Sequence, residues 1–189
     1  MSIDLKKFER DLPPFIPSLL DVLLPMGFTP TVVGGIVRDY LLFNRMGKDW
    51  DVELSHESFA WDLNSWKELG KALGKLGRVT YLPYDLIRLD IDSYQVEFSP
   101  PRIETFTDDQ HHKNFTVVFD YKLPFETAIL RRDFTINSMG VRFVNKKQLE
   151  FLDPSNGLLH LREKTLHPTG KDFERDPVRF LRAIRFMVK

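Results

Sequence analysis

Apolar residues in the first part of the chain fall into short runs, and the period changes from one run to the next. Residues 17–24 have the spacing of a short helix. The β-branched run at residues 28–33 predicts a strand that stops at Gly34 and Gly35. A helix is expected to follow through Leu42. The chain is therefore predicted to begin with a helix, a strand and a second helix.

The next segment returns to strand spacing, passes through one helix and then stays strand-like. Residues 49–54 alternate between polar and apolar side chains, which predicts a strand. Residues 58–77 predict a helix closed by two glycines. Its apolar positions and closing glycines are Phe59, Leu63, Trp66, Leu69, Leu73, Gly74 and Gly77. Strands are predicted at residues 78–82, 86–92 and 94–99, so strands surround a helix and indicate an α+β fold.

The second half begins with a polar, breaker-rich stretch. Residues 100–114 are expected to form a loop of the kind that is often functional. A helix is predicted over residues 125–133 and a hairpin over 138–144 and 148–153. Residues 173–189 predict an amphipathic helix. Four apolar positions share one of its faces: Val178, Leu181, Ile184 and Val188.

The composition describes an ordinary globular chain and leaves any ligand to local sites. The 189 residues suffice for one main core, with 42% hydrophobic and 29% charged residues. Lys plus Arg equals Asp plus Glu at 27 each, so net charge gives no support to a nucleic-acid partner. The chain has no cysteine, which excludes disulfides and thiolate metal sites. Prolines and Asp21 interrupt the apolar residues near the start, so no membrane segment is predicted and we expect a cytoplasmic protein.

Acidic residues on the strand at 49–54 are the first candidates for chemistry. Asp49, Asp51 and Glu53 alternate, so on a strand all three point to one face. Alternating acids also occur on ordinary solvated strand faces, and that reading alone would explain them. Glu97, on a later predicted strand, offers a further carboxylate.

Gly34 and Gly35 change the interpretation of these acids. A strand that ends in two glycines and enters a helix lets backbone N–H groups approach a phosphate. Two glycines are also common in a plain tight turn. Together with paired acids, however, they favour a metal-bound triphosphate, because Mg²⁺ prefers carboxylate and phosphate oxygens.

Six motifs in order resemble one known family. They are GGIVRDYLL, KDWDVE, VEFSPPR, RRDFTINSM, DPSNG and DPVRFLRAIRF. Their order is similar to that in the bacterial-type, class II tRNA nucleotidyltransferase and poly(A) polymerase family. The resemblance implies a polymerase-β-like head, a small mixed sheet with helices, over residues 1–168. Residues 169–189 would then begin a helical neck.

The resemblance assigns roles in the head. Asp49 and Asp51 match the metal-binding aspartates, and Glu97 matches the third acid of the wider superfamily, whereas Glu53 falls outside the pair. Two Mg²⁺ ions would activate an RNA 3′ hydroxyl and stabilise departing pyrophosphate. The remaining nucleotide contacts implied for the head are Gly34, Gly35, Arg38, Arg132 and Asp133.

An alternative remains for Asp133, and a neighbouring acid, Asp39, is left out of the nucleotide contacts. Asp133 would accept hydrogen bonds from a ribose or from Arg132, although an Arg-Arg-Asp sequence is also typical of a salt bridge that ends a helix. Asp39 is expected to stabilise its loop rather than bind nucleotide.

The neck segment bears on which base is chosen. Cytosine and adenine each place an amino donor beside a ring-nitrogen acceptor, so a carboxylate plus a guanidinium can pair with either. Asp176 and Arg179 match the family's protein template, which implies CTP and ATP as substrates. Arg182 and Arg185 match nucleotide-site positions, but the helix rotates them away, so phosphate contact or structural support is expected. A basic solvated helix face is the alternative, and Arg175 stands where the family usually has Glu.

The leading hypothesis is a CCA-adding enzyme that transfers CMP and AMP to the 3′ end of tRNA. Poly(A) polymerase, CC-only or A-only addition, and a CTP- and ATP-binding module without turnover are the alternatives. The resemblance also implies that the chain stops within the neck at Lys189, as a catalytic head or as a reduced member. His111 and His112 are expected on the surface of a loop that matches the family's flexible loop. The sequence carries no signal for an oligomeric state.

Overall fold

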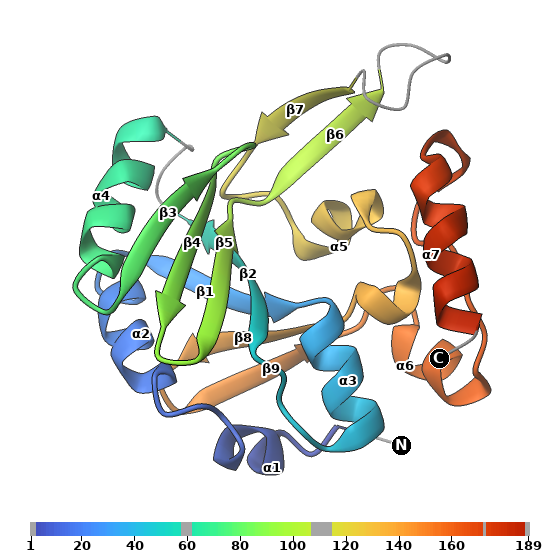
Figure 1. Ribbon diagram of the computed structural model, residues 1–189, viewed down its shortest axis with the longest axis horizontal. Coiled ribbons are helices and arrows are strands. Elements are labelled where there is room, and N and C mark those ends of the chain that lie inside the picture. The colour runs from blue at the N-terminus through green and yellow to red at the C-terminus, as the bar shows by residue number, and fades with distance from the viewer. Residues whose placement is uncertain (1–2, 58–61, 107–114, 172, 188–189) are drawn as a thin grey trace.

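A seven-stranded mixed sheet forms the centre of the computed structural model, which describes residues 3–57, 62–106, 115–171 and 173–187 (Figure 1). Its strands are β1 (Phe28–Val33), β2 (Asp49–His56), β3 (Arg78–Leu82), β4 (Leu86–Ile91), β5 (Tyr94–Ser99), β8 (Gly140–Asn145) and β9 (Gln148–Leu152). Their spatial order is β3-β4-β5-β2-β1-β8-β9. Strand β2 runs parallel to β5, and all other neighbours in this sheet are antiparallel. The predicted α+β fold with a mixed sheet is confirmed.

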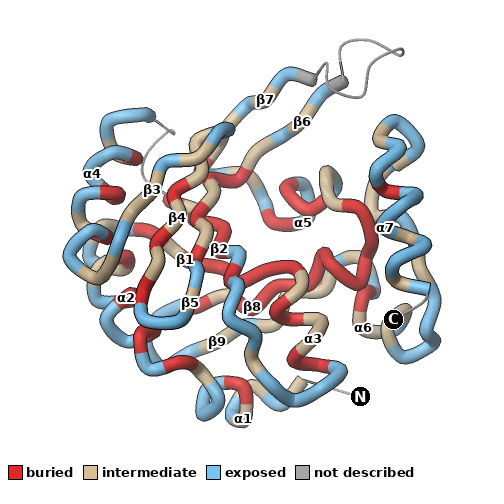
Figure 2. Tube along the Cα trace, viewed as in Figure 1, coloured by how far each residue is buried: buried red, intermediate tan, exposed pale blue. Residues whose placement is uncertain are grey.

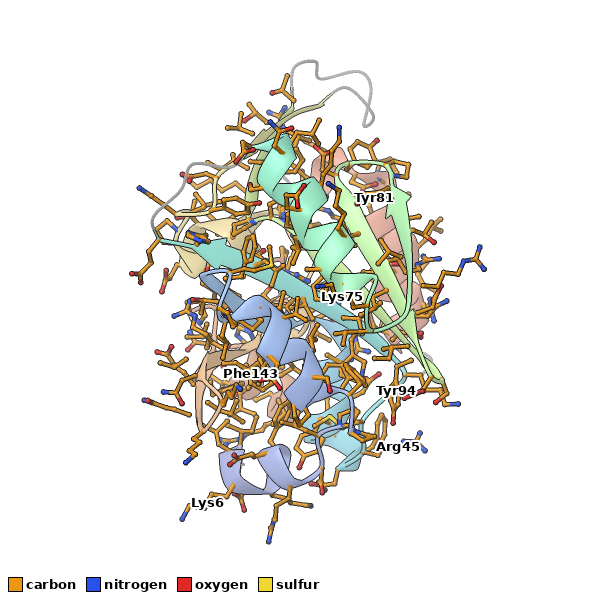
Figure 3. All side chains as sticks on the ribbon, turned by 90° about the vertical axis from the view of Figure 1, so that its left-hand side faces the viewer. Lys6, Arg45, Lys75, Tyr81, Tyr94 and Phe143 are labelled. Carbon is orange, nitrogen blue, oxygen red and sulfur yellow. The ribbon has the colours of Figure 1, made fainter. Side chains whose placement is uncertain are left out.

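Four helices supply the apolar residues that pack on one face of this sheet. They are α1 (Leu5–Arg10), α2 (Ile16–Leu23), α3 (Gly35–Phe43) and α4 (Leu63–Leu73). Figure 3 shows α4, α2 and α1 following one another along that side of the sheet. Trp50 and Val52 of β2 pack with Trp66 of α4 in one core cluster. Because side chains alternate along a strand, the residues between them point to the opposite face.

Burial alternates along β2 and thereby separates a core face from a site face. Trp50, Val52 and Leu54 are buried, whereas Asp49 and Asp51 are exposed. Figure 2 shows the same change between buried and accessible positions along neighbouring strands. Fully burying one such apolar side chain contributes about 1.5–3 kcal/mol. Because the apolar side chains of β2 pack on the core face, Asp49 and Asp51 point to the opposite face of the sheet.

Several short helices and the last helix lie beside the site face of the sheet. They are α5 (Phe125–Ala128), η1 (Ile129–Arg131), η2 (Thr135–Asn137), α6 (Gly157–Glu163), η3 (Phe173–Arg175) and α7 (Pro177–Met187). A separate two-stranded sheet pairs β6 (Arg102–Phe106) with β7 (Phe115–Phe119). In Figure 1 this hairpin projects beyond the main sheet, and α5 lies between it and α7.

The predicted loop at residues 100–114 is wrong in part. Arg102–Phe106 forms strand β6 and pairs with β7, with Ile103 opposite Val118. Arg102 and Glu104 lie two positions apart on this strand and form an ion pair at 2.8 Å. The polar residues that suggested a loop are therefore paired with each other on a strand. Residues 107–114, with His111 and His112, lie outside the described residues.

The predicted helix at residues 125–133 is shorter in the structure. It ends at Ala128 and continues only as a 3₁₀ turn, and Arg132 is extended with φ −73° and ψ 162°. A continuing helix would tie the Thr135 N–H to the Arg131 carbonyl. Instead, the Thr135 N–H donates to the His167 carbonyl at 3.0 Å, and the Arg131 carbonyl accepts from Nη2 of Arg179. Long-range partners therefore end this helix.

The last helix begins later than residue 173. Phe173–Arg175 is a 3₁₀ turn, and α7 starts at Pro177. Proline lacks an N–H and disfavours helical backbone in the residue before it, which places the boundary there. The Asp176 carboxylate accepts from the Val178 N–H at 3.0 Å and caps the new helix.

The apolar face of α7 is largely uncovered. Val178, Leu181 and Ile184 are 50%, 67% and 59% exposed, whereas Arg179 is only 7% exposed. The alternative of a basic solvated face is therefore wrong for Arg179. Val188 lies outside the described residues, as does Phe59 at the start of the helix predicted over residues 58–77, which the structure shows as α4.

Two helices had no counterpart among the sequence predictions, α1 and α6. Asp4 caps α1 by accepting from the Lys7 N–H at 3.0 Å. Asp153 accepts from the Gly157 and Leu158 N–H groups and holds the first turn of α6. None of the helices in the described part of the chain is long and apolar enough to cross a membrane.

Candidate active site

Gly34 forms the turn that links β1 to α3 beside the acids. Its φ of 80° and ψ of −138° lie in a region that side-chain-bearing residues rarely adopt. A Cβ built on Gly34 would lie 3.2 Å from Nη1 of Arg132 and 3.2 Å from Oδ2 of Asp51. The absence of a side chain therefore leaves room where an arginine, an aspartate and a helix N-terminus meet.

The acids of β2 and β5 lie side by side. Asp49 and Asp51 occupy the same face of β2, and Glu97 of β5 is the register partner of Asp51. Arg88 binds Glu97 through Nη2 at 2.6 Å and Nε at 3.0 Å. The sequence thus located three acids that the sheet brings together, but it did not identify the arginine that holds one of them.

Asp51 has the most perturbed environment of these acids. Burial by the surrounding protein raises the pKa of its carboxyl even though part of the residue reaches water, and Glu97 and Asp49 raise the pKa further. The positive charge of Arg132 lowers this pKa and is the largest opposing influence. The ionised form of Asp51 is therefore disfavoured unless a cation binds beside it.

The donor set can be compared with what a divalent cation requires. Within the described residues, no group of three or more His, Cys, Asp or Glu side chains could hold a metal ion by itself. Mg²⁺ is usually held by one or two carboxylates with phosphate oxygens and water. Asp49 and Asp51 fit that smaller set, with the crowding of negative charge around Asp51 as the supporting observation.

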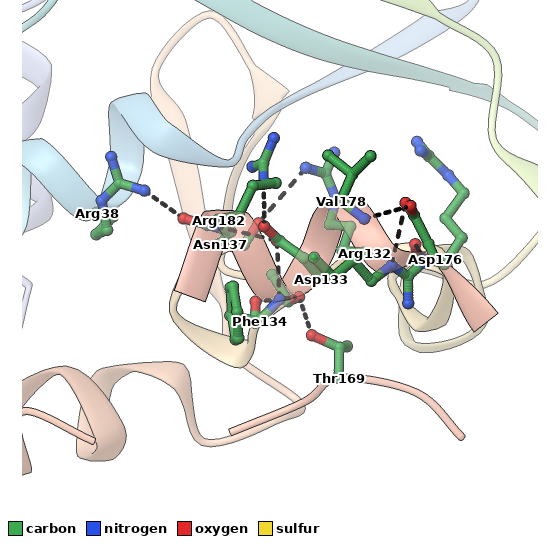
Figure 4. A network of polar contacts seen from close by, with 12 residues as sticks. Arg38, Arg132, Asp133, Phe134, Asn137, Thr169, Asp176, Val178 and Arg182 are labelled. Carbon is green, nitrogen blue, oxygen red and sulfur yellow. Dashed lines mark hydrogen bonds and ion pairs between the residues drawn. The ribbon is translucent and has the colours of Figure 1, made fainter. Parts of the chain in front are cut away.

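Asp133 lies at the centre of a buried polar network (Figure 4). It is 8% exposed and accepts from the Phe134 N–H at 2.8 Å. Nδ2 of Asn137 donates to it at 3.0 Å, and Nε of Arg182 donates at 2.6 Å. Both oxygens of its carboxylate are therefore engaged, Oδ1 by the backbone and amide donors and Oδ2 by the guanidinium.

Asn137 connects this network to the glycine turn. Its Oδ1 accepts from Nη1 of Arg38, and its backbone carbonyl accepts from Nη1 of Arg132 at 3.4 Å. Arg38 is further held by Asp39, with Nε donating at 2.8 Å, and lies over the Phe186 ring at 4.9 Å. Asp39 itself lies within α3 rather than in a loop, so the predicted loop-stabilising role does not describe its position. Asn137 was not singled out from the sequence, although it lies four residues after Asp133 in the same motif.

Asp176 and Arg179 lie together at the start of α7. Nε of Arg179 is 3.8 Å from Oδ2 of Asp176, and Nη2 of Arg179 donates to the Arg131 carbonyl at 2.7 Å. Arg182 is half-exposed and bound to Asp133, whereas Arg185 is exposed farther along the helix. The structure therefore groups Arg182 with the buried network and leaves Arg185 apart from it.

A family model described as the Poly A polymerase head domain matches residues 31–167. That span runs from the glycine turn through both acid-bearing strands and the Asp133 network. The chain belongs to the Poly A polymerase head-domain family.

Relatives of this head domain carry several related names. An A-adding tRNA nucleotidyltransferase of Aquifex aeolicus is 33% identical over 162 residues, covering 82% of this chain and 18% of that protein. A multifunctional CCA protein of Xanthomonas oryzae is 31% identical, covering 84% and 34%. Poly(A) polymerase I of Haemophilus influenzae is 26% identical, covering 91% and 37%. The chain thus spans well under half the length of these relatives.

Solved structures place the head domain in the same fold. A CCA-adding enzyme in an apo form superposes with a TM-score of 0.75 at 25% identity, over 100% of this chain and 44% of that one. A tRNA nucleotidyltransferase complexed with a primer tRNA and an incoming ATP analog gives 0.62 at 27% identity, over 88% and 43%. The predicted head architecture is thereby confirmed, and the chain carries a nucleotidyltransferase head.

Proposed function

We propose that this head transfers CMP and AMP from CTP and ATP to the 3′ end of tRNA, completing CCA. The observation that carries the proposal is the meeting of Asp51, the Gly34 turn and Arg132 within one site. These residues bring carboxylates, the N-terminus of α3 and a guanidinium together, and this chemistry suits a metal-bound triphosphate. The names of the CCA-adding relatives support the choice of RNA end.

The residues of the chain would act mainly by position and charge. The N-terminus of α3 at Gly34 and Gly35 would receive phosphate oxygens, and Arg38 and Arg132 would neutralise them. Asp49 and Asp51 would hold Mg²⁺, which supplies Lewis-acid activation of the 3′ hydroxyl and of the departing pyrophosphate. Glu97 would complete the negative field while Arg88 keeps part of its charge balanced. The new bond joins the 3′ oxygen to the α-phosphorus as the bond to pyrophosphate breaks.

Base choice would rest on the start of α7. The Asp176 carboxylate accepts from an exocyclic amino group, and the Arg179 guanidinium donates to the ring nitrogen beside it. Guanine and uracil present an acceptor where the carboxylate needs a donor. Arg179 is fixed by the Arg131 carbonyl, which supports a preset rather than adaptable template. Arg182 and Arg185 would give structural and phosphate support.

Residues 1–168 are proposed as the head domain and 169–189 as the first part of a neck. The bonds from Arg179 and Arg182 to the head would make that junction part of the nucleotide site. Poly(A) addition and A-only addition are the nearest alternatives, because relatives of both names match this chain.

Incorporation into tRNA transcripts tests the proposal. Transcripts that end before CCA, after C and after CC are each incubated with Mg²⁺ and with single or mixed nucleotides. We expect addition that stops at CCA, and no addition by Asp49→Ala. A continuing A ladder would instead establish poly(A) polymerase, and addition only to the CC transcript would establish an A-adding enzyme. Selective binding of CTP and ATP without pyrophosphate release would identify a binding module.

A further inference from the structure

A cavity lies beside Arg179, and neither glycine of the turn lines it. It has a volume of about 360 Å³ and is enclosed by β6, by the α5–η1 segment and by the start of α7. These are the elements that flank the space between the hairpin and α7 in Figure 1. Its charged lining consists of Arg102, Glu104, Arg131, Arg175 and Arg179.

Positive charge exceeds negative charge in this lining. Glu104 is the one acid among the described residues that line the cavity, and Arg102 already binds it at 2.8 Å. Arg131, Arg175 and Arg179 add three more guanidinium groups, and Glu53 and Asp176 lie against Arg131 and Arg179 from outside the lining. A lining of this kind favours an anion, because a bound negative charge relieves repulsion among neighbouring cations.

Arg131 shows how strongly these groups crowd one another. Its Nε is buried and has no hydrogen-bond partner within the described part of the chain, where Oε2 of Glu53 lies 3.6 Å from Nη2. Burial lowers the pKa of Arg131 to about 10, with repulsion from Arg132 and Arg102 as the next causes. A buried guanidinium surrounded by other guanidinium groups is costly unless an anion or a carboxylate offsets its charge.

The cavity is distinct from the proposed triphosphate site. Arg132 points to Gly34 and the acids, whereas Arg131, its neighbour in sequence, lines the cavity. Arg179 joins the two regions, since its Nη2 donates to the Arg131 carbonyl while its Nε faces Asp176. An anion in the cavity would therefore lie beside the proposed base template and apart from the metal acids.

We infer that this arginine-lined cavity binds a phosphate group. Guanidinium groups match phosphate oxygens through paired, fixed donors, and several of them converge here from three different elements. The inference rests on the proposed function for the source of the phosphate. The backbone of the RNA primer and free pyrophosphate both carry this chemistry.

Equilibrium binding tests the inference without requiring turnover. The full chain and its Arg175→Gln variant are titrated against a fluorescein-labelled tRNA transcript ending in CC, without nucleotide, over a range of KCl concentrations. Arg175 is exposed, so its replacement should leave the fold intact. Arg78→Gln removes an equal charge from exposed strand β3 and is the matched control. Calorimetric titration with sodium pyrophosphate forms the second arm.

We expect Arg175→Gln to weaken RNA binding about fivefold and to reduce the salt slope by about 0.7, the change for one lost single-strand phosphate contact. Arg78→Gln should change neither quantity appreciably. Arg175→Lys should restore the salt slope but only part of the affinity, because it keeps the charge without the planar fork.

Three outcomes decide the matter. Weaker RNA binding supports the cavity with the primer as its phosphate source. Unchanged RNA binding with weaker pyrophosphate binding supports it with the free anion as source. If neither affinity changes relative to Arg78→Gln, the inference is overturned. Failure of the proposed function would show separately, as a chain that incorporates no nucleotide whatever these affinities are.

Discussion

The acids of β2 and the carboxylate of Asp133 lie in one site but are satisfied in opposite ways. Among the described residues, Asp49 and Asp51 have no hydrogen-bond donor for their carboxylates, and both are exposed. Asp133 is buried and accepts from a backbone N–H, an amide and a guanidinium. The open acids are thus suited to receive charge from a ligand, whereas the closed one holds other groups in position. Chemistry and positioning should therefore respond differently to substitution.

Removing an open acid should have the largest effect on activity and almost none on stability. Asp51→Ala is expected to lower the rate of nucleotide transfer roughly a thousandfold, because several kcal/mol of metal-assisted charge stabilisation are lost. The free energy of unfolding should stay within about 0.5 kcal/mol of the parent or rise, because the pKa of Asp51 shows that its ionised form is disfavoured in the fold. Single-turnover incorporation and urea unfolding measure the two quantities.

Asp21→Ala is the control for Asp51→Ala. It removes an exposed aspartate that pairs with Lys146 away from the site. Equal rates of nucleotide transfer in the two variants would show that Asp51 is not a catalytic residue.

Glu53 lies on the same strand as Asp49 and Asp51 but is buried. Its substitution shows whether it supports the fold, as Asp133 does, rather than the chemistry. Glu53→Gln should lower the free energy of unfolding by about 3 kcal/mol, because it leaves the buried Arg131 without its acid. Glu150→Gln breaks the more exposed Arg142–Glu150 pair and should cost less than about 1 kcal/mol. Denaturant midpoints compare them, and equal losses would contradict a supporting role for Glu53.

The closed network should lose stability and activity together. Asp133→Asn is expected to cost about 2 kcal/mol, since a charge-assisted bond to Arg182 is replaced by two facing donors. Arg182→Gln alters the half-exposed side of the same bond and should cost about half as much, because water can replace the lost partner. Thermal unfolding of both variants and of the double variant gives their coupling. A double variant whose loss equals the sum of the single losses would show that the pair is not coupled.

The smallest expected effect concerns nucleotide choice. Arg179→Lys should reduce the preference for CTP and ATP over UTP and GTP about tenfold, because lysine lacks the fixed fork that the template requires. Arg185→Lys, on the exposed part of α7, should change this preference less than twofold. The ratio of kcat/KM for the four nucleotides measures the effect. Unchanged selectivity in Arg179→Lys would count against the protein template.

Local patterns in the sequence were sufficient for the parts of the fold that depend on neighbours along the chain. The β-branched run into Gly34, the alternating acids of β2 and the hairpin of β8 and β9 all appear as predicted. The family motifs also selected residues that the structure gathers in one site, including Asp51, Arg132 and Asp133.

The missed features depend on partners that are distant in sequence. Strand β6 resembled a loop because its charges pair with each other and its apolar partner Val118 comes after the intervening segment. Asn137 is an ordinary polar residue until its bonds to Arg38 and Asp133 are known. The exposed apolar face of α7 could not be foreseen either, because spacing shows that apolar residues share a face but not which face packs.

The glycine turn also sets an order on the assembly of the site during synthesis. The Gly34 N–H donates to the Met139 carbonyl at 3.3 Å, and Arg38 reaches Asn137, 99 positions later in the chain. Contacts between residues so far apart close late, because the intervening chain must first be made and ordered. A nascent chain that has left the ribosome only as far as β5 therefore contains Asp49, Asp51 and Glu97 but neither Asn137 nor the Met139 carbonyl.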